Sequence, residues 1–164
     1  MDERASSIAL AYPMPAAAHA ALPPIRDYHL WASEQAALIR AGRFDQIDRL
    51  NVADEIESLG KSEFRSVVSA LEQILLHMLK WDHQPERRSK SWVHSIAVHR
   101  QHLADDLKDS PSLQSRLEEA AERAYRYARL GAAKETNLAL ELFPDLSPYS
   151  WQQIIEAPYQ IDRD

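Results

Sequence analysis

The chain of 164 residues contains no cysteine. This absence excludes disulfide bonds, thiol nucleophiles and thiolate metal sites. A chain without disulfides suits a reducing compartment, so we expect a cytoplasmic protein. No sequence pattern in the chain points to a bound cofactor.

Glycine is also scarce, with 3 residues against 9 prolines. The chain has no Asn-Gly, Asp-Gly or Gly-Gly pair, so the tight turns of β-hairpins are not expected. Phosphate-binding glycine loops and the Gly-x-Ser-x-Gly elbow of many hydrolases are excluded for the same reason. The composition therefore favours helices.

Long apolar runs are missing too, and none approaches the ~20 residues needed to span a bilayer. The net charge is -6 at pH 7, which argues against a general attraction to nucleic acid or anionic membranes. Residues 1–26 form an Ala/Pro-rich arm, and Asp2 and Glu3 stand where a secretory signal carries basic residues. We expect this arm to pack on the domain or on a neighbouring subunit.

Hydrophobic periodicity predicts an all-α fold for the rest of the chain. The prediction is a single helical domain over residues 27–164, an antiparallel bundle of about five main helices with an extended N-terminal arm. The clearest stripe begins at Phe64 and recurs at three- and four-residue steps to Met78. Gly60 either breaks a helix there or only weakens it. The predicted helices cover residues 27–41, 45–60, 62–84, 89–110, 112–136 and 150–156.

Four blocks of sequence carry a family resemblance: DYHLWASEQAALIRAGRFDQIDRLNVADEIESLGKSE, LLHMLKWDHQPERRSKSW, HRQHLADDLKDSPSL and AYRYARLGAAKETNLALELFPDLSPYSWQQIIEAPY. Over residues 27–159 the chain resembles the bacterial family called domain of unknown function 29. The resemblance implies an all-helical fold and a bacterial origin, and it implies no reaction. His83 and His94 fall outside the family's motifs. The positions that match those motifs are Glu55, Ile56, Glu57, Ser58, Leu59, Gly60, His77, Lys80, Trp81, Pro85, Arg88, Ser91, Trp92, Arg100 and Pro111.

A buried polar network is the first candidate for a site. Carboxylates seldom bury unpaired, and a guanidinium suits a carboxylate bidentately. We therefore predict that Arg88 or Arg100 pairs with Glu55 or Glu57 and locks the helices together. The residues of this polar cluster or ligand site are Glu55, Glu57, His77, Trp81, Arg88, Trp92 and Arg100.

Two enzymatic alternatives compete with a structural network. Arg88 and His94 have a spacing similar to the Arg-x(4–6)-His signature of helical HEPN ribonucleases, in which the arginine stabilises a phosphate and the histidine acts on a ribose hydroxyl. His99 and His102, with Asp105 and Asp106, lie at helical spacings that could share a metal. No second helix offers a Glu-x-x-His partner for such a centre, so we expect no metal.

A basic cluster beside aromatic residues offers a third alternative. Arg87, Arg88 and Lys90 stand between Trp81 and Trp92, as in proteins that bind single-stranded nucleic acid. Three cations are few, and helix packing explains the tryptophans equally well. Our leading hypothesis is thus a non-enzymatic helical binding domain that acts on a protein partner or on a second copy of itself.

Overall fold

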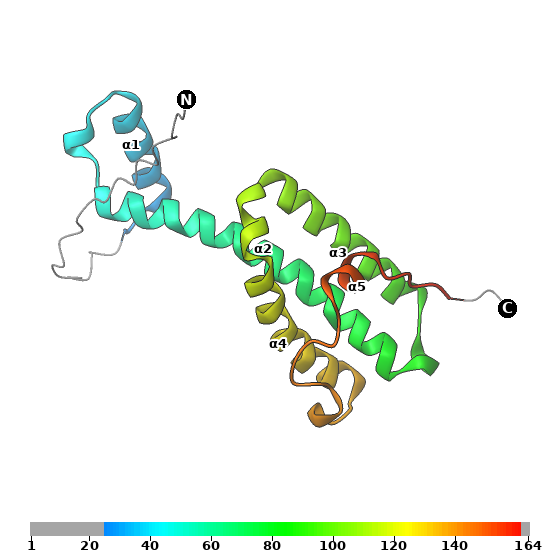
Figure 1. The fold of residues 1–164 in the computed structure, drawn as a ribbon. Coiled ribbons are helices and arrows are strands. Elements are labelled where there is room, and N and C mark those ends of the chain that lie inside the picture. The colour runs from blue at the N-terminus through cyan, green and yellow to red at the C-terminus, as the bar shows by residue number, and fades with distance from the viewer. Residues whose placement is uncertain (1–24, 162–164) are drawn as a thin grey trace, which may run out of the picture. The chain divides into compact units, whose positions relative to one another are not determined.

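The computed structural model describes residues 25–161, and they form α-helices and short 3-10 helices without a strand (Figure 1). The all-α prediction is therefore confirmed. The short 3-10 helices are η1 (Phe44–Gln46), η2 (Pro85–Arg87), η3 (Pro111–Arg116) and η4 (Leu140–Leu142). The α-helices are α1 (Tyr28–Arg40), α2 (Arg49–His83), α3 (Lys90–Asp109), α4 (Leu117–Thr136) and α5 (Trp151–Glu156).

The chain divides into two compact units, Met1–Ala53 and Asp54–Asp164. In the first unit, the carboxylate of Asp27 accepts a hydrogen bond from the amide of Leu30 and caps α1. Gly42 follows α1 with φ +70°, a conformation that side chains disfavour. No residue of α1 is buried. The single domain over residues 27–164 stays a prediction, and most of the predicted arm lies outside the described residues.

Helix α2 joins two helices that the sequence analysis treated separately. It runs without a break through Gly60, so this glycine is a weak point and not an end. A glycine inside a helix costs about 1 kcal/mol relative to alanine, which the other residues of a 35-residue helix outweigh.

The core of the second unit is built by the C-terminal part of α2 together with α3, α4 and the C-terminal segment. The predicted stripe of α2 is its centre, because Leu71, Ile74 and Met78 are fully buried. Helix α4 contributes small residues at every fourth position, which allow neighbouring helices to approach closely. These residues are Ala120, Ala124, Ala128 and Ala132.

The chain reverses direction at two prolines. Pro85 opens the corner between α2 and α3, and Pro111 opens the corner between α3 and α4. Because each corner turns the chain back, α3 runs antiparallel to both α2 and α4 (Figure 1). The predicted antiparallel arrangement is confirmed.

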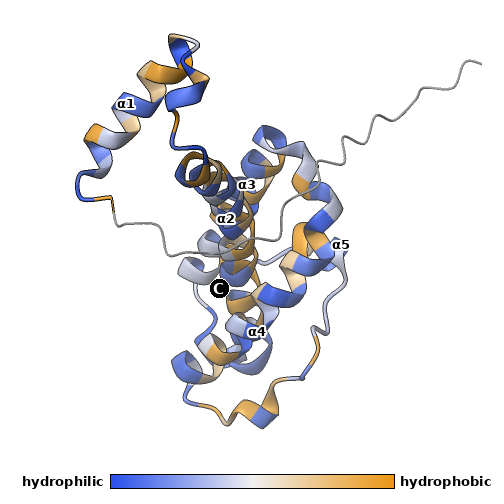
Figure 2. Ribbon diagram, turned by 90° about the vertical axis from the view of Figure 1, so that its left-hand side faces the viewer, coloured by the Kyte–Doolittle hydropathy of each residue, from blue (hydrophilic) through white to orange (hydrophobic). Residues whose placement is uncertain are grey.

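Hydrophobic and hydrophilic residues alternate along the helices, as expected for helices that bury one face (Figure 2). Within residues 25–161, no helix combines the length and the apolar character needed to cross a membrane.

Candidate functional site

The predicted pairing of arginine with Glu55 or Glu57 is wrong. Among the described residues, Glu57 pairs with Lys61 one turn along α2, at 3.2 Å, and both side chains are largely exposed. The Nε–H of Arg88 donates to the backbone carbonyl of Trp81 at 3.0 Å. The prediction assumed that the carboxylates of α2 were buried, whereas Glu57 is exposed and Glu55 is only partly buried, so neither needs an internal cation.

Within residues 25–161, Arg100 likewise binds backbone carbonyls and no carboxylate. Its guanidinium donates to the backbone oxygens of Ile154 at 2.7 Å, Ala157 at 2.9 Å and Gln153 at 3.1 Å. These oxygens lie at the C-terminal end of α5, where the last carbonyls of a helix lack partners in the helix, although the Gln153 carbonyl also accepts from the amide of Ala157. Arg100 of α3 therefore caps α5 and holds the C-terminal segment. Its partial burial lowers the pKa of the guanidinium.

Three of the predicted site residues meet in one stack of rings and guanidinium groups. Arg88 lies 4.7 Å from the Trp81 ring, Trp81 packs edge-on against Tyr159 at 5.3 Å, and Arg100 lies 5.6 Å from the Tyr159 ring. Burial raises the pKa of Tyr159 to about 12. The stack is satisfied within the protein by cation–π and aromatic contacts. Sequence reasoning missed Tyr159, which links its two halves.

Two further residues of the predicted site, His77 and Trp92, lie near Lys80, which is only 8% exposed. Its ammonium lies 2.6 Å from Glu135 and 4.7 Å from the centre of the Trp92 ring. His77 lies one turn earlier on α2, and its Nδ1–H donates to the carbonyl of Gln73 at 2.8 Å. Desolvation lowers the pKa of His77. This cluster joins α2, α3 and α4.

The proposed metal ligands of α3 do not converge. The rings of His99 and His102 contact each other edge to face at 5.5 Å, and burial lowers the pKa of His99. Asp105 accepts from Gln101, and Asp106 accepts from Ser66 of α2. Nowhere in residues 25–161 do three or more His, Asp or Glu side chains gather to hold a metal ion.

Within residues 25–161, no hydrogen bond or ring contact joins Arg88 and His94, the proposed ribonuclease pair. His94 is exposed on α3, while the Nε–H of Arg88 is committed to the Trp81 carbonyl. RNA cleavage by this pair stays a prediction.

A cavity of about 810 Å³ lies between α4 and the segment that leads into α5. We call it the α4 groove. Most of its lining is apolar, and the exposed side chains of Leu146 and Trp151 extend this apolar surface. Its lining residues are Leu117, Glu118, Ala121, Glu122, Tyr125, Arg126, Asp145, Leu146, Ser147, Tyr149, Trp151 and Ile154.

Hydrogen bonds from α4 fix one wall of the groove. The hydroxyl of Tyr125 donates to the carbonyl of Pro144 at 2.7 Å. Arg129 donates to the carbonyl of Phe143 at 3.0 Å and pairs with Asp145 at 2.7 Å. The segment after η4 is therefore held in place although it has no regular structure.

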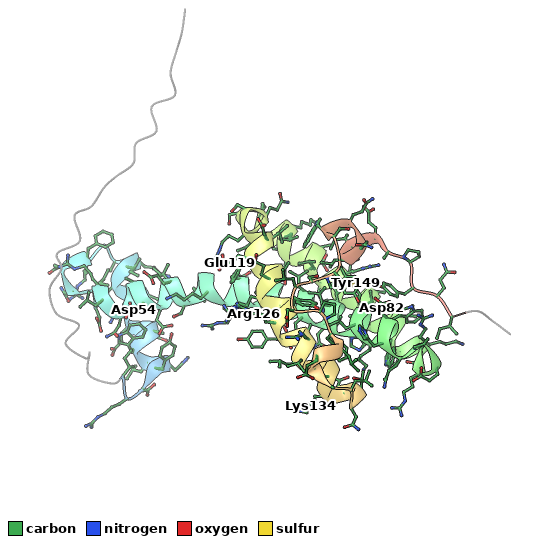
Figure 3. The ribbon with its side chains drawn as sticks, turned by 60° about the horizontal axis from the view of Figure 1, so that its bottom comes forward. Asp54, Asp82, Glu119, Arg126, Lys134 and Tyr149 are labelled. Carbon is green, nitrogen blue, oxygen red and sulfur yellow. The ribbon has the colours of Figure 1, made fainter. Side chains whose placement is uncertain are left out.

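Tyr149 and α5 complete that wall. The Tyr149 hydroxyl donates to the carboxylate of Asp82 at 2.7 Å, and the two residues lie together in Figure 3. Burial is the largest cause that raises the pKa of Tyr149 well above its ordinary value. Ser150 and Gln153 cap α5 reciprocally. The groove is thus preformed, and most of its exposed lining is apolar, as is typical of binding sites.

Sequence reasoning missed the α4 groove. The only available signal was the density of aromatic residues and prolines after residue 143, which does not show where a loop folds back.

A model of the family described as "Domain of unknown function DUF29" matches residues 25–160. No curated protein and no solved structure matches the chain.

Proposed function

Because the chain belongs to the family of the domain of unknown function DUF29, whose description names no reaction, we propose a binding role that rests on its own geometry. The protein is a non-enzymatic helical domain that holds apolar side chains of a protein partner in the α4 groove. The observation that carries this proposal is the preformed, largely apolar cavity of about 810 Å³.

The size and rim of the groove support this role. Binding cavities usually have volumes of about 300–1,000 Å³ and apolar linings with a few polar groups. Leu146 is 83% exposed and Trp151 is 39% exposed. Large apolar side chains beside a cavity are typical of surfaces that a partner covers.

Rigidity favours binding as well. A wall held by Tyr125, Arg129 and Tyr149 loses little conformational entropy when a partner docks. The arginines of the predicted cluster are engaged with carbonyls and rings within the protein, which supports a structural role for them. A cytoplasmic location, a bacterial origin and self-association stay predictions.

The neutral dye Nile red tests the groove, because its fluorescence rises in apolar surroundings. Ala121→Trp places an indole against the cavity from the α4 wall. Lys134→Trp introduces the same side chain at an exposed position of α4 that does not line the cavity. We expect the dye signal to persist in the wild type and in Lys134→Trp and to fall several-fold in Ala121→Trp.

Circular dichroism would reveal whether Ala121→Trp misfolds. A second variant tests the groove in that case. Leu146→Asp replaces an exposed apolar side chain of the rim without disturbing the core, and it should also weaken the signal. Equal dye binding by all folded variants, or none by the wild type, would overturn the proposal.

A further inference from the structure

The charged rim of the α4 groove indicates the chemistry of its occupant. Glu118 and Glu122 line the groove one helical turn apart on α4, and both are exposed. Among residues 25–161, neither carboxylate is recorded in an ion pair or a hydrogen bond. Two carboxylates at this spacing repel each other, so a nearby cation would stabilise both.

Neighbouring carboxylates differ in this respect. Glu119 binds Arg116 through two hydrogen bonds of 2.8 Å, and Asp145 pairs with Arg129 at 2.7 Å. The protein therefore neutralises the acids on either side and leaves Glu118 and Glu122 to solvent.

Arg126 lies one turn beyond Glu122 and also lines the groove. The rim of α4 is thus acidic toward the N-terminal end of the helix and basic one turn after Glu122. Figure 3 labels Glu119 and Arg126 along this stretch of α4. Such a gradient orients a charged segment as well as attracting it.

We infer that the groove takes a cationic amphipathic segment of a partner protein. An aliphatic or aromatic side chain of the segment enters the cavity beside Ala121 and Ile154, and a lysine or arginine lies against Glu118 and Glu122. This inference rests on the proposed function and names the partner's chemistry. Helices that place apolar anchors in a groove and charges on its rim are a common mode of peptide recognition.

Three labelled model peptides of equal length and equal leucine and tryptophan content test this inference. Their polar positions carry lysine, glutamine or glutamate. Fluorescence anisotropy with the full chain should give the tightest binding for the lysine peptide, by roughly 3- to 10-fold over the glutamine peptide at low salt. Added salt should reduce this preference, since rim charges are screened.

Charge variants show which residues cause the preference for the lysine peptide. Glu118→Gln/Glu122→Gln should abolish the preference for the lysine peptide over the glutamine peptide. Glu86→Gln/Glu141→Gln changes the net charge equally at exposed positions outside the groove and should retain the preference. Ala121→Trp should weaken all three peptides.

The outcomes separate this inference from the proposed function. If Nile red binds in the groove but the peptides bind without charge preference, with a preference for glutamate, or not at all, the inference is overturned and the groove remains. If Nile red does not bind in the groove, both proposals fail. A lysine preference that survives Glu118→Gln/Glu122→Gln also overturns the inference.

Discussion

The ammonium of Lys80 lies 2.6 Å from a carboxylate oxygen of Glu135, a residue 55 positions further along the chain. The same ammonium lies 4.7 Å from the centre of the Trp92 ring. One cation therefore joins α2, α3 and α4. Lys80 is nearly buried, whereas about half of the Glu135 side chain is exposed, so the lysine depends more on the pair than the glutamate does.

Glu135→Ala should destabilise the protein because it leaves the charge of Lys80 without its carboxylate. Breaking a buried pair costs about 3–5 kcal/mol, and we expect roughly 1–3 kcal/mol here because water reaches Glu135. Urea denaturation measures the loss. Lys134→Ala, which removes a neighbouring exposed side chain, should change stability by less than about 0.5 kcal/mol. Equal losses in the two variants would contradict the role of the pair.

Arg100→Ala should weaken the attachment of the C-terminal segment. It removes three hydrogen bonds from a charged donor to the end of α5, and we expect a loss of roughly 2–4 kcal/mol. Arg100→Lys should recover less than half of this loss, because an ammonium cannot reproduce the planar guanidinium fork. Amide exchange of residues 151–157 should accelerate in both variants.

Arg87→Ala is the matched control for Arg100→Ala, because Arg87 is exposed and its side chain makes no hydrogen bond or ion pair within residues 25–161. Its unfolding and its exchange over α5 should resemble the wild type. If Arg100→Ala were equally mild, the capping role of Arg100 would be refuted.

Gly60→Ala should stabilise the protein. Gly60 lies inside α2, and a Cβ added there would meet nothing within 4 Å. Alanine should therefore gain about 0.5–1 kcal/mol from helix propensity alone. Gly131→Ala is the comparison, because its Cβ would approach Leu76 to 3.2 Å and part of the gain would be lost in moving that side chain. Thermal denaturation ranks the two, and a larger gain for Gly131→Ala would contradict this argument.

The helices could be predicted from sequence because their signals are local. The stripe from Phe64 to Met78 and the corners at Pro85 and Pro111 each depend on residues a few positions apart. The continuity of α2 through Gly60 was harder to predict, because helix propensity does not decide whether a helix ends at a single glycine or continues through it.

The site could not be predicted because its contacts join distant segments. Arg100 binds carbonyls more than 50 positions away, and a backbone carbonyl leaves no mark in a sequence pattern. Tyr149 reaches Asp82 across 67 positions and thereby forms a wall of the α4 groove. The prediction that Arg88 meets Glu55 or Glu57 failed because charge type alone does not reveal exposure.

The pKa shifts of two histidines predict that the protein loses stability in mild acid. Burial lowers the pKa of His77 and of His99 below their ordinary value of 6.5. In the unfolded chain these rings take up protons near pH 6.5, whereas in the folded protein they do so only at lower pH. The unfolded state therefore binds more protons in this window, and stability falls as pH drops below 6.5.

His77→Gln/His99→Gln should flatten this dependence. Urea midpoints measured between pH 7.5 and about 5.5 should decline in the wild type and stay nearly level in the double variant. His94→Gln changes an exposed histidine of α3 and should keep the wild-type slope. Glu72 acts in the opposite sense, because burial raises the pKa of its carboxyl above the ordinary value. A wild-type midpoint that does not change over this range would show that the histidines are solvated in the folded protein.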